Sequence, residues 1–354
     1  MNTILQDTGK ISTTLFEQLL PDQCGKSNAN VIQGPAFGVD TAVIDIGNGL
    51  GLATSSDPLS LIPSLGIKES AWLSVHLMAN DMATTGFAPE YVQWVMNLPV
   101  DFSADAFKEY WSHIHPICEE AGIAITGGHT GRVPGQQSTI PGGGTMFLKA
   151  PLAKIITSAG AEPGDRIIVT KESALAASSI LAKSFPQTIK TELGETVCKQ
   201  AAQNFYRTSV LPEALIASEF LQPNRELKAM HDVTEGGILG AIAEMGHASG
   251  CGFRVHSDQI PVHQAALQIT QLFEIDHRFC VGAGSMIMAV AKNKAVTLIE
   301  ALHQQDIPAT DVGMMSSAES GFKLVTKGKE EAFIFNGKDP YWDAFYQAME
   351  AGWK

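Results

Sequence analysis

Apolar residues at helical spacing predict a long helix early in the chain. They recur on one face at Trp72, Val75, Ala79 and Met82, and the run stops at the glycine of "TTGFAP". The same stretch carries an adjacent polar pair, Asn80 and Asp81. A packing helix does not require that pair, so the pair either faces solvent or is directed at a ligand.

Other patterns predict a hairpin, a helix and a strand in the same half. Residues 41–56, "TAVIDIGNGLGLATSS", are typical of a β-hairpin with its turn at residues 47–49. A helix with one apolar face is predicted from Ser103 to Gly122, followed by the short strand "IAIT". That strand leads into "GGHTG", and glycines at a strand end indicate a tight loop or a close approach to a ligand.

The second half repeats this kind of organisation. A stretch with Ser, Gly and Pro at residues 158–164 predicts a boundary, which gives domains 1–158 and 159–354. Beyond it, "ESALAASSILAKSF", a segment near residues 195–220 and "AVTLIEALHQQ" read as helices, whereas "SMIMAVA" reads as a strand. "GGILGAIAEMGHASGCGFRV" predicts a helix that ends at Gly250, and then a strand. Both halves therefore indicate an α+β fold.

Composition and charge narrow the partners. Hydrophobic residues make up 45% of the chain and charged residues 17%, which is typical of a globular protein. The net charge of -13 and the lack of basic runs argue against a nucleic-acid partner. An acidic protein needs a cation to bind a polyphosphate, so a metal–nucleotide ligand remains compatible.

Cysteine usage and the N-terminus favour a cytoplasmic protein. The five cysteines are scattered, odd in number and without CxxC spacing, so we expect reduced thiols. "MNTILQDTGKISTTLFEQLL" lacks the apolar region of a signal peptide, and no run approaches the ~20 apolar residues of a membrane span. We therefore expect no membrane partner.

Four carboxylates stand beside glycine or small polar residues at the ends of predicted elements: Asp40, Asp57, Asp81 and Asp232. Each alone is typical of a turn or a cap, because Asp readily accepts local backbone N–H groups. Four such sites on separate segments also suit Mg²⁺, which prefers hard oxygen ligands and is usually held by one or two carboxylates together with substrate phosphates.

Two glycine-containing segments could face an anion. The predicted loop at residues 127–136 offers backbone N–H groups and the hydroxyl of Thr130, although it is not a Walker A loop. His129 in that loop either orients phosphate or is simply satisfied by its neighbours. "TEGG" opens a helix whose N–H groups could also face an anion, with Thr234 as the N-cap. The other histidines show no zinc-ligand spacing.

Together, "GVDTAVID" with "TSSDP", "LMANDMATTGFAPEY", "GGHTGRVPG" and "MHDVTEGGILGAIAEMGHASGCGFRV" resemble the motifs of the AIR synthase superfamily over about residues 30–315. This superfamily includes aminoimidazole ribonucleotide synthase, HypE, selenophosphate synthetase and thiamine-monophosphate kinase. The resemblance implies an N-terminal α+β domain that builds a β-barrel across a homodimer, a C-terminal α+β domain, and ATP with Mg²⁺ in the cleft between them.

The resemblance also implies site residues. Asp40, Asp81 and Asp232 correspond to magnesium ligands, and the implied nucleotide contacts are Asp57, Asn80, Gly127, Gly128, His129 and Thr130. Lys26 in "QCGKSNANVIQGP" is a further candidate contact. Catalytic residues are not identified by these motifs.

The implied function is ATP-dependent activation of an amide, acid or similar oxygen of an unidentified acceptor, in the HypE-like or AIR-synthase-related branch. The end "MEAGWK" lacks the terminal cysteine of HypE, and His129 replaces a glutamate in the "GGETAEMPG" of aminoimidazole ribonucleotide synthase. Two alternatives stay open: a small-molecule kinase similar to thiamine-monophosphate kinase, and an inactive nucleotide-binding partner in a maturation complex.

Overall fold

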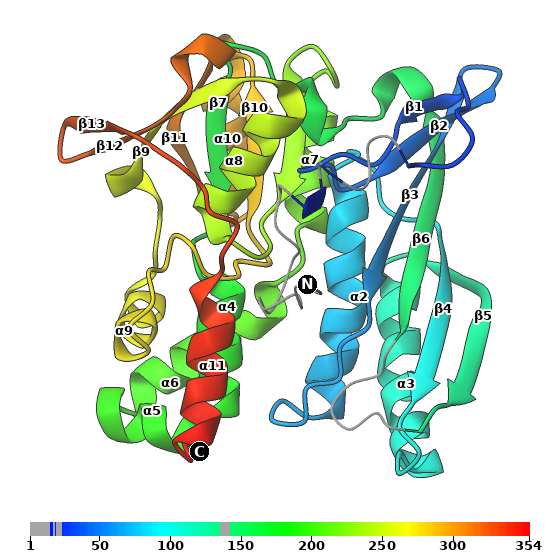
Figure 1. The fold of residues 1–354 in the computed structure, drawn as a ribbon, viewed down its shortest axis with the longest axis vertical. Coiled ribbons are helices and arrows are strands. Elements are labelled where there is room, and N and C mark those ends of the chain that lie inside the picture. The colour runs from blue at the N-terminus through cyan, green and yellow to red at the C-terminus, as the bar shows by residue number, and fades with distance from the viewer. Residues whose placement is uncertain (1–14, 17, 19–22, 135–141) are drawn as a thin grey trace.

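Two β-sheets organise the chain (Figure 1). The computed structural model describes residues 15, 16, 18, 23–134 and 142–354. Within them, β1 to β6 form a six-stranded sheet in the order β1-β2-β3-β6-β4-β5, and β7 to β13 form a seven-stranded sheet in the order β13-β12-β9-β11-β7-β10-β8. Helix α2 (Ile67–Ala83) contacts both sheets, through β3 and β6 on one side and β8 on the other.

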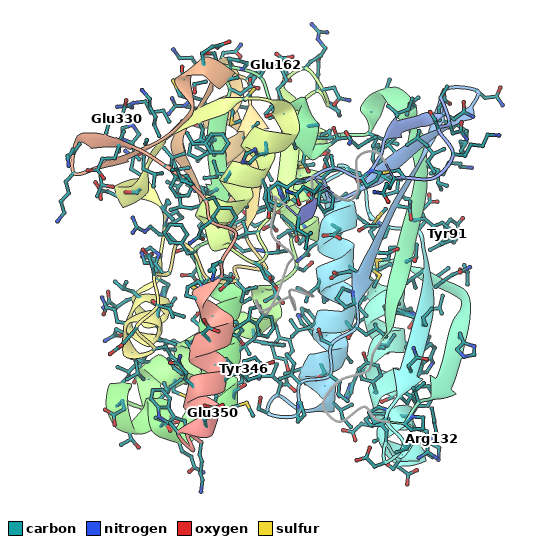
Figure 2. The ribbon with its side chains drawn as sticks, in the orientation of Figure 1. Tyr91, Arg132, Glu162, Glu330, Tyr346 and Glu350 are labelled. Carbon is teal, nitrogen blue, oxygen red and sulfur yellow. The ribbon has the colours of Figure 1, made fainter. Side chains whose placement is uncertain are left out.

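In the part of the chain that the structure describes, the helices that cover the first sheet lie on one of its faces. Its strands are β1 (Val31–Gln33), β2 (Ala42–Gly47), β3 (Leu50–Pro58), β4 (Tyr91–Leu98), β5 (Ala124–Arg132) and β6 (Gly142–Pro151). Helices α2 and α3 (Ala104–Glu120) pack together against it (Figure 1). On the other face, Tyr91, which is labelled in Figure 2, and Val95 of β4 remain 39% and 44% exposed.

Local sequence signals in this half are confirmed. Strands β2 and β3 pair antiparallel around the turn at residues 47–49. Ser103 caps α3 by accepting the Ala106 N–H, and Gly122 follows the helix at a φ of 75°.

The expected glycine loop after "IAIT" is wrong for its first part. Residues 127–132 continue β5, which pairs parallel with β4. A Cβ at Gly128 would lie 1.8 Å from the Trp94 carbonyl oxygen, so glycine is required there by strand packing. Residues 133 and 134 of the predicted loop follow the strand without belonging to it, and residues 135 and 136 fall outside the described residues.

The second sheet has helices on both of its sides (Figure 1). Its strands are β7 (Arg166–Thr170), β8 (Leu227–Asp232), β9 (Gly252–His256), β10 (Met286–Val290), β11 (Ala309–Ser316), β12 (Phe322–Thr326) and β13 (Lys329–Ala332). The helices of this half are α4 (Leu175–Ser184), α5 (Pro186–Leu193), α6 (Glu195–Gln203), α7 (Leu211–Phe220), α8 (Gly237–Ser249), α9 (Gln264–Leu272), α10 (Ala295–His303) and α11 (Pro340–Glu350).

Most elements expected in this half are present. Helix α8 ends at Gly250 in the left-handed conformation, and β9 follows. The single helix expected near residues 195–220 is instead two, α6 and α7, separated by a 3-10 turn at Asn204–Arg207. Pro212 in the first turn of α7 explains the break, because proline is tolerated at a helix start but not inside a helix.

A segment of the second half, residues 207–210, is held from two sides. From α2, the Asn80 carboxamide donates to the Thr208 carbonyl (2.8 Å) and accepts the Val210 N–H (2.9 Å). From the end of β7, the Lys171 ammonium donates to the carbonyls of Arg207 and Ser209 at 3.2 and 2.6 Å. The two Asn80 contacts join α2 to the second half.

None of the helices in the described part of the chain combines the length and apolarity needed to cross a bilayer.

Candidate functional site

Four aspartates that are far apart in sequence lie together between the two halves. This carboxylate cluster consists of Asp40 before β2, Asp57 in β3, Asp81 on α2 and Asp232 at the end of β8. Ligand atoms of Asp40, His231 and Asp232 all lie within 4.8 Å of one another. The charges of Asp232, Asp57 and Asp40 each act on Asp81. The predicted convergence of carboxylates from both halves is therefore present in the structure.

Asp40 reaches the cluster because its loop lies tightly against α8. Gly38 has a φ of +77°, and a Cβ there would lie 2.2 Å from the Glu244 carbonyl oxygen. Only glycine fits that position. The Ser158 hydroxyl donates to Oδ2 of Asp40 at 3.0 Å, which fixes one of its two carboxylate oxygens.

Asp81 projects from the polar end of α2 into the same region. Ser55 on β3 donates to its Oδ2 at 2.6 Å. Burial raises the pKa of Asp81 well above its usual value, and repulsion from Asp232, Asp57 and Asp40 raises it further, although the Ser55 hydrogen bond opposes the shift. The ionised form of Asp81 is thus unfavourable until a positive charge joins the cluster.

His231 lies beside Asp232 with both ring nitrogens close to carboxylates. Its Nδ1 lies 3.1 Å from Asp40 Oδ1 and 3.9 Å from Asp232 Oδ1, and its Nε2 lies 3.0 Å from Glu244 Oε2. These approaches fall outside ideal hydrogen-bond directions, so the attraction is chiefly electrostatic. Burial favours the neutral ring, but Asp40 above all, with Asp232 and Glu244, raises the pKa of His231 well above its usual value.

The donor set suits a hard divalent cation. Asp40, Asp81 and Asp232 offer carboxylate oxygens from two halves of the chain, which are the ligands that Mg²⁺ prefers. Both nitrogens of His231 face carboxylates, so its ring belongs outside an oxygen-ligated magnesium site. A single histidine, even when protonated, does not balance the carboxylates around it. The residues present therefore fit Mg²⁺.

The other predicted site residues are not gathered at this cluster. Gly127, Gly128, His129 and Thr130 lie on edge strand β5, which β6 and β4 separate from Asp57 on β3. Asp57, Gly144, Trp94 and Gly128 form one row across the sheet. Three strand spacings put Gly128 about 14 Å from Asp57. Lys26 is exposed in the segment before β1.

Asn80 has a different role from the predicted nucleotide contact. Its side chain is fully buried, and its carboxamide is bonded to backbone groups of Thr208 and Val210. Neighbouring residues of a helix point about 100° apart, so Asn80 packs against the second half while Asp81 faces the cluster. The adjacent residues Asn80 and Asp81 therefore serve two purposes.

The predicted anion site at "TEGG" is occupied by the chain's own carboxylate. Helix α8 begins at Gly237, after Gly236 in a left-handed conformation, so Thr234 is not its N-cap. The Gly236 N–H donates to Asp339 Oδ2 at 2.8 Å. Burial raises the pKa of Asp339 to about 6, although the hydrogen bonds that its carboxylate accepts from the N–H groups of Tyr341 and Gly236 lower it.

Sequence reasoning missed four supporting residues: Ser55, Ser158, His231 and Glu244. His231 directly precedes Asp232 in "MHDVTEGG", so its position was a usable signal. Glu244 lies in the middle of α8 and is 3% exposed, and no local pattern distinguishes it from a surface glutamate. Only the packing of α8 against β8 reveals its role.

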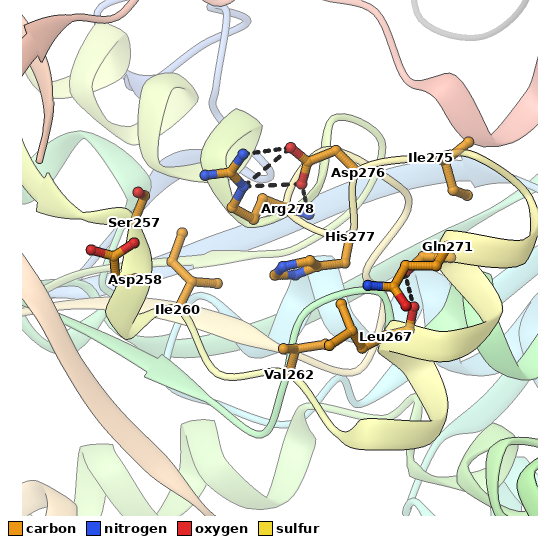
Figure 3. Close-up of a pocket in the computed structure, with 11 residues that line it drawn as sticks. Ser257, Asp258, Ile260, Val262, Leu267, Gln271, Ile275, Asp276, His277 and Arg278 are labelled. Atoms are coloured by element: carbon orange, nitrogen blue, oxygen red, sulfur yellow. Dashed lines mark hydrogen bonds and ion pairs between the residues drawn. The ribbon is translucent and has the colours of Figure 1, made fainter. Parts of the chain in front are cut away.

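A cavity of about 460 Å³ lies apart from the cluster, beside α9 (Figure 3). Figure 3 shows the apolar residues Ile260 and Leu267 among those that line it, and Arg278 paired with Asp276. None of the predicted site residues lines this cavity. It therefore adds no group to the carboxylate cluster.

The cluster predicts that the metal-free protein becomes less stable as pH rises. The pKa of Asp81 is raised above 3.8 and that of His231 above 6.5, so the folded state binds more protons than the unfolded chain at both residues. The stabilising contribution of Asp81 to the free energy of unfolding therefore decreases as the pH rises above 3.8. The contribution of His231 is complete below pH 6.5 and is lost as the pH rises through the raised pKa of the folded state.

Urea unfolding at several pH values between about 5 and 8 measures the slope with which the free energy of unfolding falls as pH rises. Asp81→Asn should make the slope shallower than in the wild type, because one of the two groups is removed. Identical slopes in the two proteins would contradict the proximity of these charges.

Family comparisons agree with the fold. Residues 38–147 match the AIR synthase related protein, N-terminal domain, and residues 162–324 match the AIR synthase related protein, C-terminal domain.

Curated relatives are distant. A putative hydrogenase expression/formation protein of Methanocaldococcus jannaschii is 23% identical over 235 residues, or 66% of each chain. The carbamoyl dehydratase HypE of Escherichia coli is 25% identical over 232 residues, covering 65% of this chain and 64% of the relative. The chain thus spans slightly less than two thirds of either. A thiamine-monophosphate kinase of Salmonella typhimurium is 23% identical over 341 residues, 90% of this chain and 95% of the kinase.

Solved structures share the architecture. A HypE–HypF complex superposes with a TM-score of 0.71 at 16% identity, covering 90% of this chain and 99% of the other. HypE in complex with ATP gives 0.67 at 18% identity, covering 89% and 92%. The fold is therefore the mixed α+β, two-domain fold of these proteins. Because family matches span both halves, the chain belongs to the AIR synthase related family.

Proposed function

We propose that this protein is an ATP- and Mg²⁺-dependent enzyme that phosphorylates, and so activates, an amide, acid or similar oxygen of an acceptor, as a HypE-like member of its family. The convergence of Asp40, Asp81 and Asp232 from both halves carries the proposal. An ATP complex of a HypE protein with the same fold supports it.

In this proposal Asp40, Asp81 and Asp232 hold the cation. Bound Mg²⁺ supplies positive charge to the phosphates and screens them from a chain with a net charge of -13. Ser55 and Ser158 keep the carboxylates of Asp81 and Asp40 in place by donating to them. His129 and Thr130 on exposed β5, with Gly127, Gly128, Asp57 and Lys26, stay proposed nucleotide contacts.

A small-molecule kinase is the second candidate. The thiamine-monophosphate kinase of Salmonella typhimurium aligns with 90% of this chain, against 65% for Escherichia coli HypE. That longer alignment favours a kinase, whereas the AIR-synthase-type and HypE-type motifs favour activation with later release of phosphate. A third possibility is a protein that binds nucleotide without turnover and docks to a maturation partner.

Product analysis separates these functions. Purified protein is incubated with ATP and Mg²⁺, and with either carboxamide acceptors or thiamine monophosphate, and the products are identified by ³¹P NMR. Inorganic phosphate released only with a carboxamide supports activation, and transfer of the phosphoryl group to thiamine monophosphate, which leaves ADP and a stable diphosphate, supports the kinase. Nucleotide binding without turnover with any acceptor would overturn both enzyme proposals and leave the binding partner.

The uncovered face of the first sheet supports a proposed homodimer. Ile46, Tyr91 and Val95 are 47%, 39% and 44% exposed on β2 and β4. Exposed apolar residues gathered on one face are typical of an association surface. We predict a dimer at micromolar concentration by light scattering, and a monomer for Val95→Lys. A monomeric wild-type protein would refute the dimer.

A further inference from the structure

Glu244 is connected to the carboxylate cluster although it cannot belong to the predicted ligand set. It lies on α8 and is 3% exposed, and its Oε2 is 3.0 Å from His231 Nε2. The opposite ring nitrogen, Nδ1, lies 3.1 Å from Asp40 Oδ1. His231, itself 1% exposed, thus links a helix of the second half to a loop of the first half.

The same part of α8 holds that loop in two other ways. A Cβ atom added at Gly38 would lie 2.2 Å from the Glu244 carbonyl oxygen, so the loop backbone lies directly against the backbone of α8 there. The His247 ring meets the Phe37 ring edge to face, with centroids 5.8 Å apart. Residues 244 and 247 are neighbours on a helix surface, so one patch of α8 sets the course of residues 37–40.

Both oxygens of Asp40 consequently have fixed neighbours. Oδ1 faces the His231 ring, and Oδ2 accepts the Ser158 hydroxyl. A carboxylate oxygen has two lone pairs, so each can still accept from a further partner. A loop carboxylate held this way loses little additional freedom when a cation binds, and such preorganisation increases affinity.

We propose that Glu244 and His231 act together as positioning residues that fix Asp40 for the divalent cation, without ligating it themselves. The inference rests on the proposed function, because it concerns the cation that the cluster would hold. It adds a specific claim: the contact between α8 and His231 sets the cation affinity, while nucleotide affinity at saturating cation is set elsewhere.

The test measures the Mg²⁺ concentration that half-saturates binding of AMPPCP, an ATP analogue, by calorimetry. Glu244→Gln keeps the size of the side chain and loses its charge. We expect it to raise that concentration about 10- to 100-fold, as loss of outer contacts at metal sites commonly does. The dissociation constant for AMPPCP at saturating Mg²⁺ should stay near the wild-type value.

Glu172→Gln is the matched control. Glu172 is also a buried glutamate of the second half, 6% exposed, but it accepts the His263 N–H and lies outside the cluster. It should leave the Mg²⁺ requirement unchanged. The same half-saturating Mg²⁺ concentration in Glu244→Gln, the control and the wild type would overturn the inference. An equal increase of that concentration in both variants would also overturn it.

A second single variant, His231→Gln, keeps the claim testable if Glu244→Gln folds poorly, and a double-mutant cycle tests the coupling if both fold. His231→Gln should raise the Mg²⁺ requirement by a similar factor, and the double variant should raise it no further, because both residues act through one contact. Additive effects would overturn the inference. Asp81→Asn is measured in parallel: if it too binds Mg²⁺–AMPPCP like the wild type, the proposed function fails; if it alone is impaired, only this inference fails.

Discussion

Replacing Asp81 by asparagine is expected to weaken binding of Mg²⁺–ATP roughly 100-fold while leaving the fold intact. Asparagine keeps an oxygen that can accept the Ser55 hydroxyl, but it removes a charged ligand from the carboxylate cluster. The repulsion from Asp232, Asp57 and Asp40 also disappears. The metal-free variant should therefore be at least as stable as the wild type. Calorimetry gives the affinity, and urea unfolding gives the stability.

Asp105→Asn is the control for this substitution. Asp105 lies on α3 with a side chain that is 92% exposed and paired only with Lys108 at the surface. Surface pairs of this kind contribute little to stability. The control should bind nucleotide like the wild type. Unchanged nucleotide affinity in Asp81→Asn, or a loss of fold, would count against the assignment of the cluster.

Replacing Lys171 by methionine is expected to lower the free energy of unfolding by about 3–5 kcal/mol, because a buried charge loses its partner. The Lys171 ammonium lies 2.8 Å from Glu213 Oε1, and the two side chains are 8% and 0% exposed. It also donates to the carbonyls of Arg207, Ser209 and Gly284. Urea unfolding measures the loss.

A paired substitution checks the cause. Lys171→Met combined with Glu213→Met removes both charges and should recover much of the lost stability, because two apolar side chains leave no charge unpaired. Asn80 holds the same segment from α2, so the segment keeps one anchor in both variants. Equal stability of the single and double variants would show that the loss does not arise from the unpaired Glu213 carboxylate.

Elements with strong local signals are the ones that sequence could predict. Helix α3 has a serine cap and one apolar face, and α8 ends at a glycine that adopts a left-handed conformation. The β2–β3 hairpin has its turn fixed by residues 47–49. In each case the information lies within a few residues, where propensity and capping act.

Elements that depend on distant partners were predicted less well. Residues 127–132 look like a loop because of their glycines, yet β4 provides a parallel strand for them to pair with. The same glycines permit the close approach of Gly128 to the Trp94 carbonyl. Local composition does not contain the order of strands in a sheet.

The candidate site also contains residues with a local sequence signal and residues whose roles depend on distant partners. Its aspartates carry a motif signal, and the structure brings Asp40, Asp81 and Asp232 together. The roles of Asn80 and Glu244 depend on which surface each faces after folding. Asn80 turns to the 207–210 segment, and Glu244 turns to His231. Neither contact has a counterpart in the local pattern.

A crystal grown with Mn²⁺ and AMPPCP shows whether the carboxylate cluster holds the cation that bridges to the nucleotide, since Mn²⁺ takes the oxygen ligands of Mg²⁺ and scatters anomalously. We predict an anomalous peak bounded by carboxylate oxygens of Asp40, Asp81 and Asp232, in contact with the phosphates. A peak elsewhere, or ordered AMPPCP whose phosphates lie away from these oxygens, would contradict it.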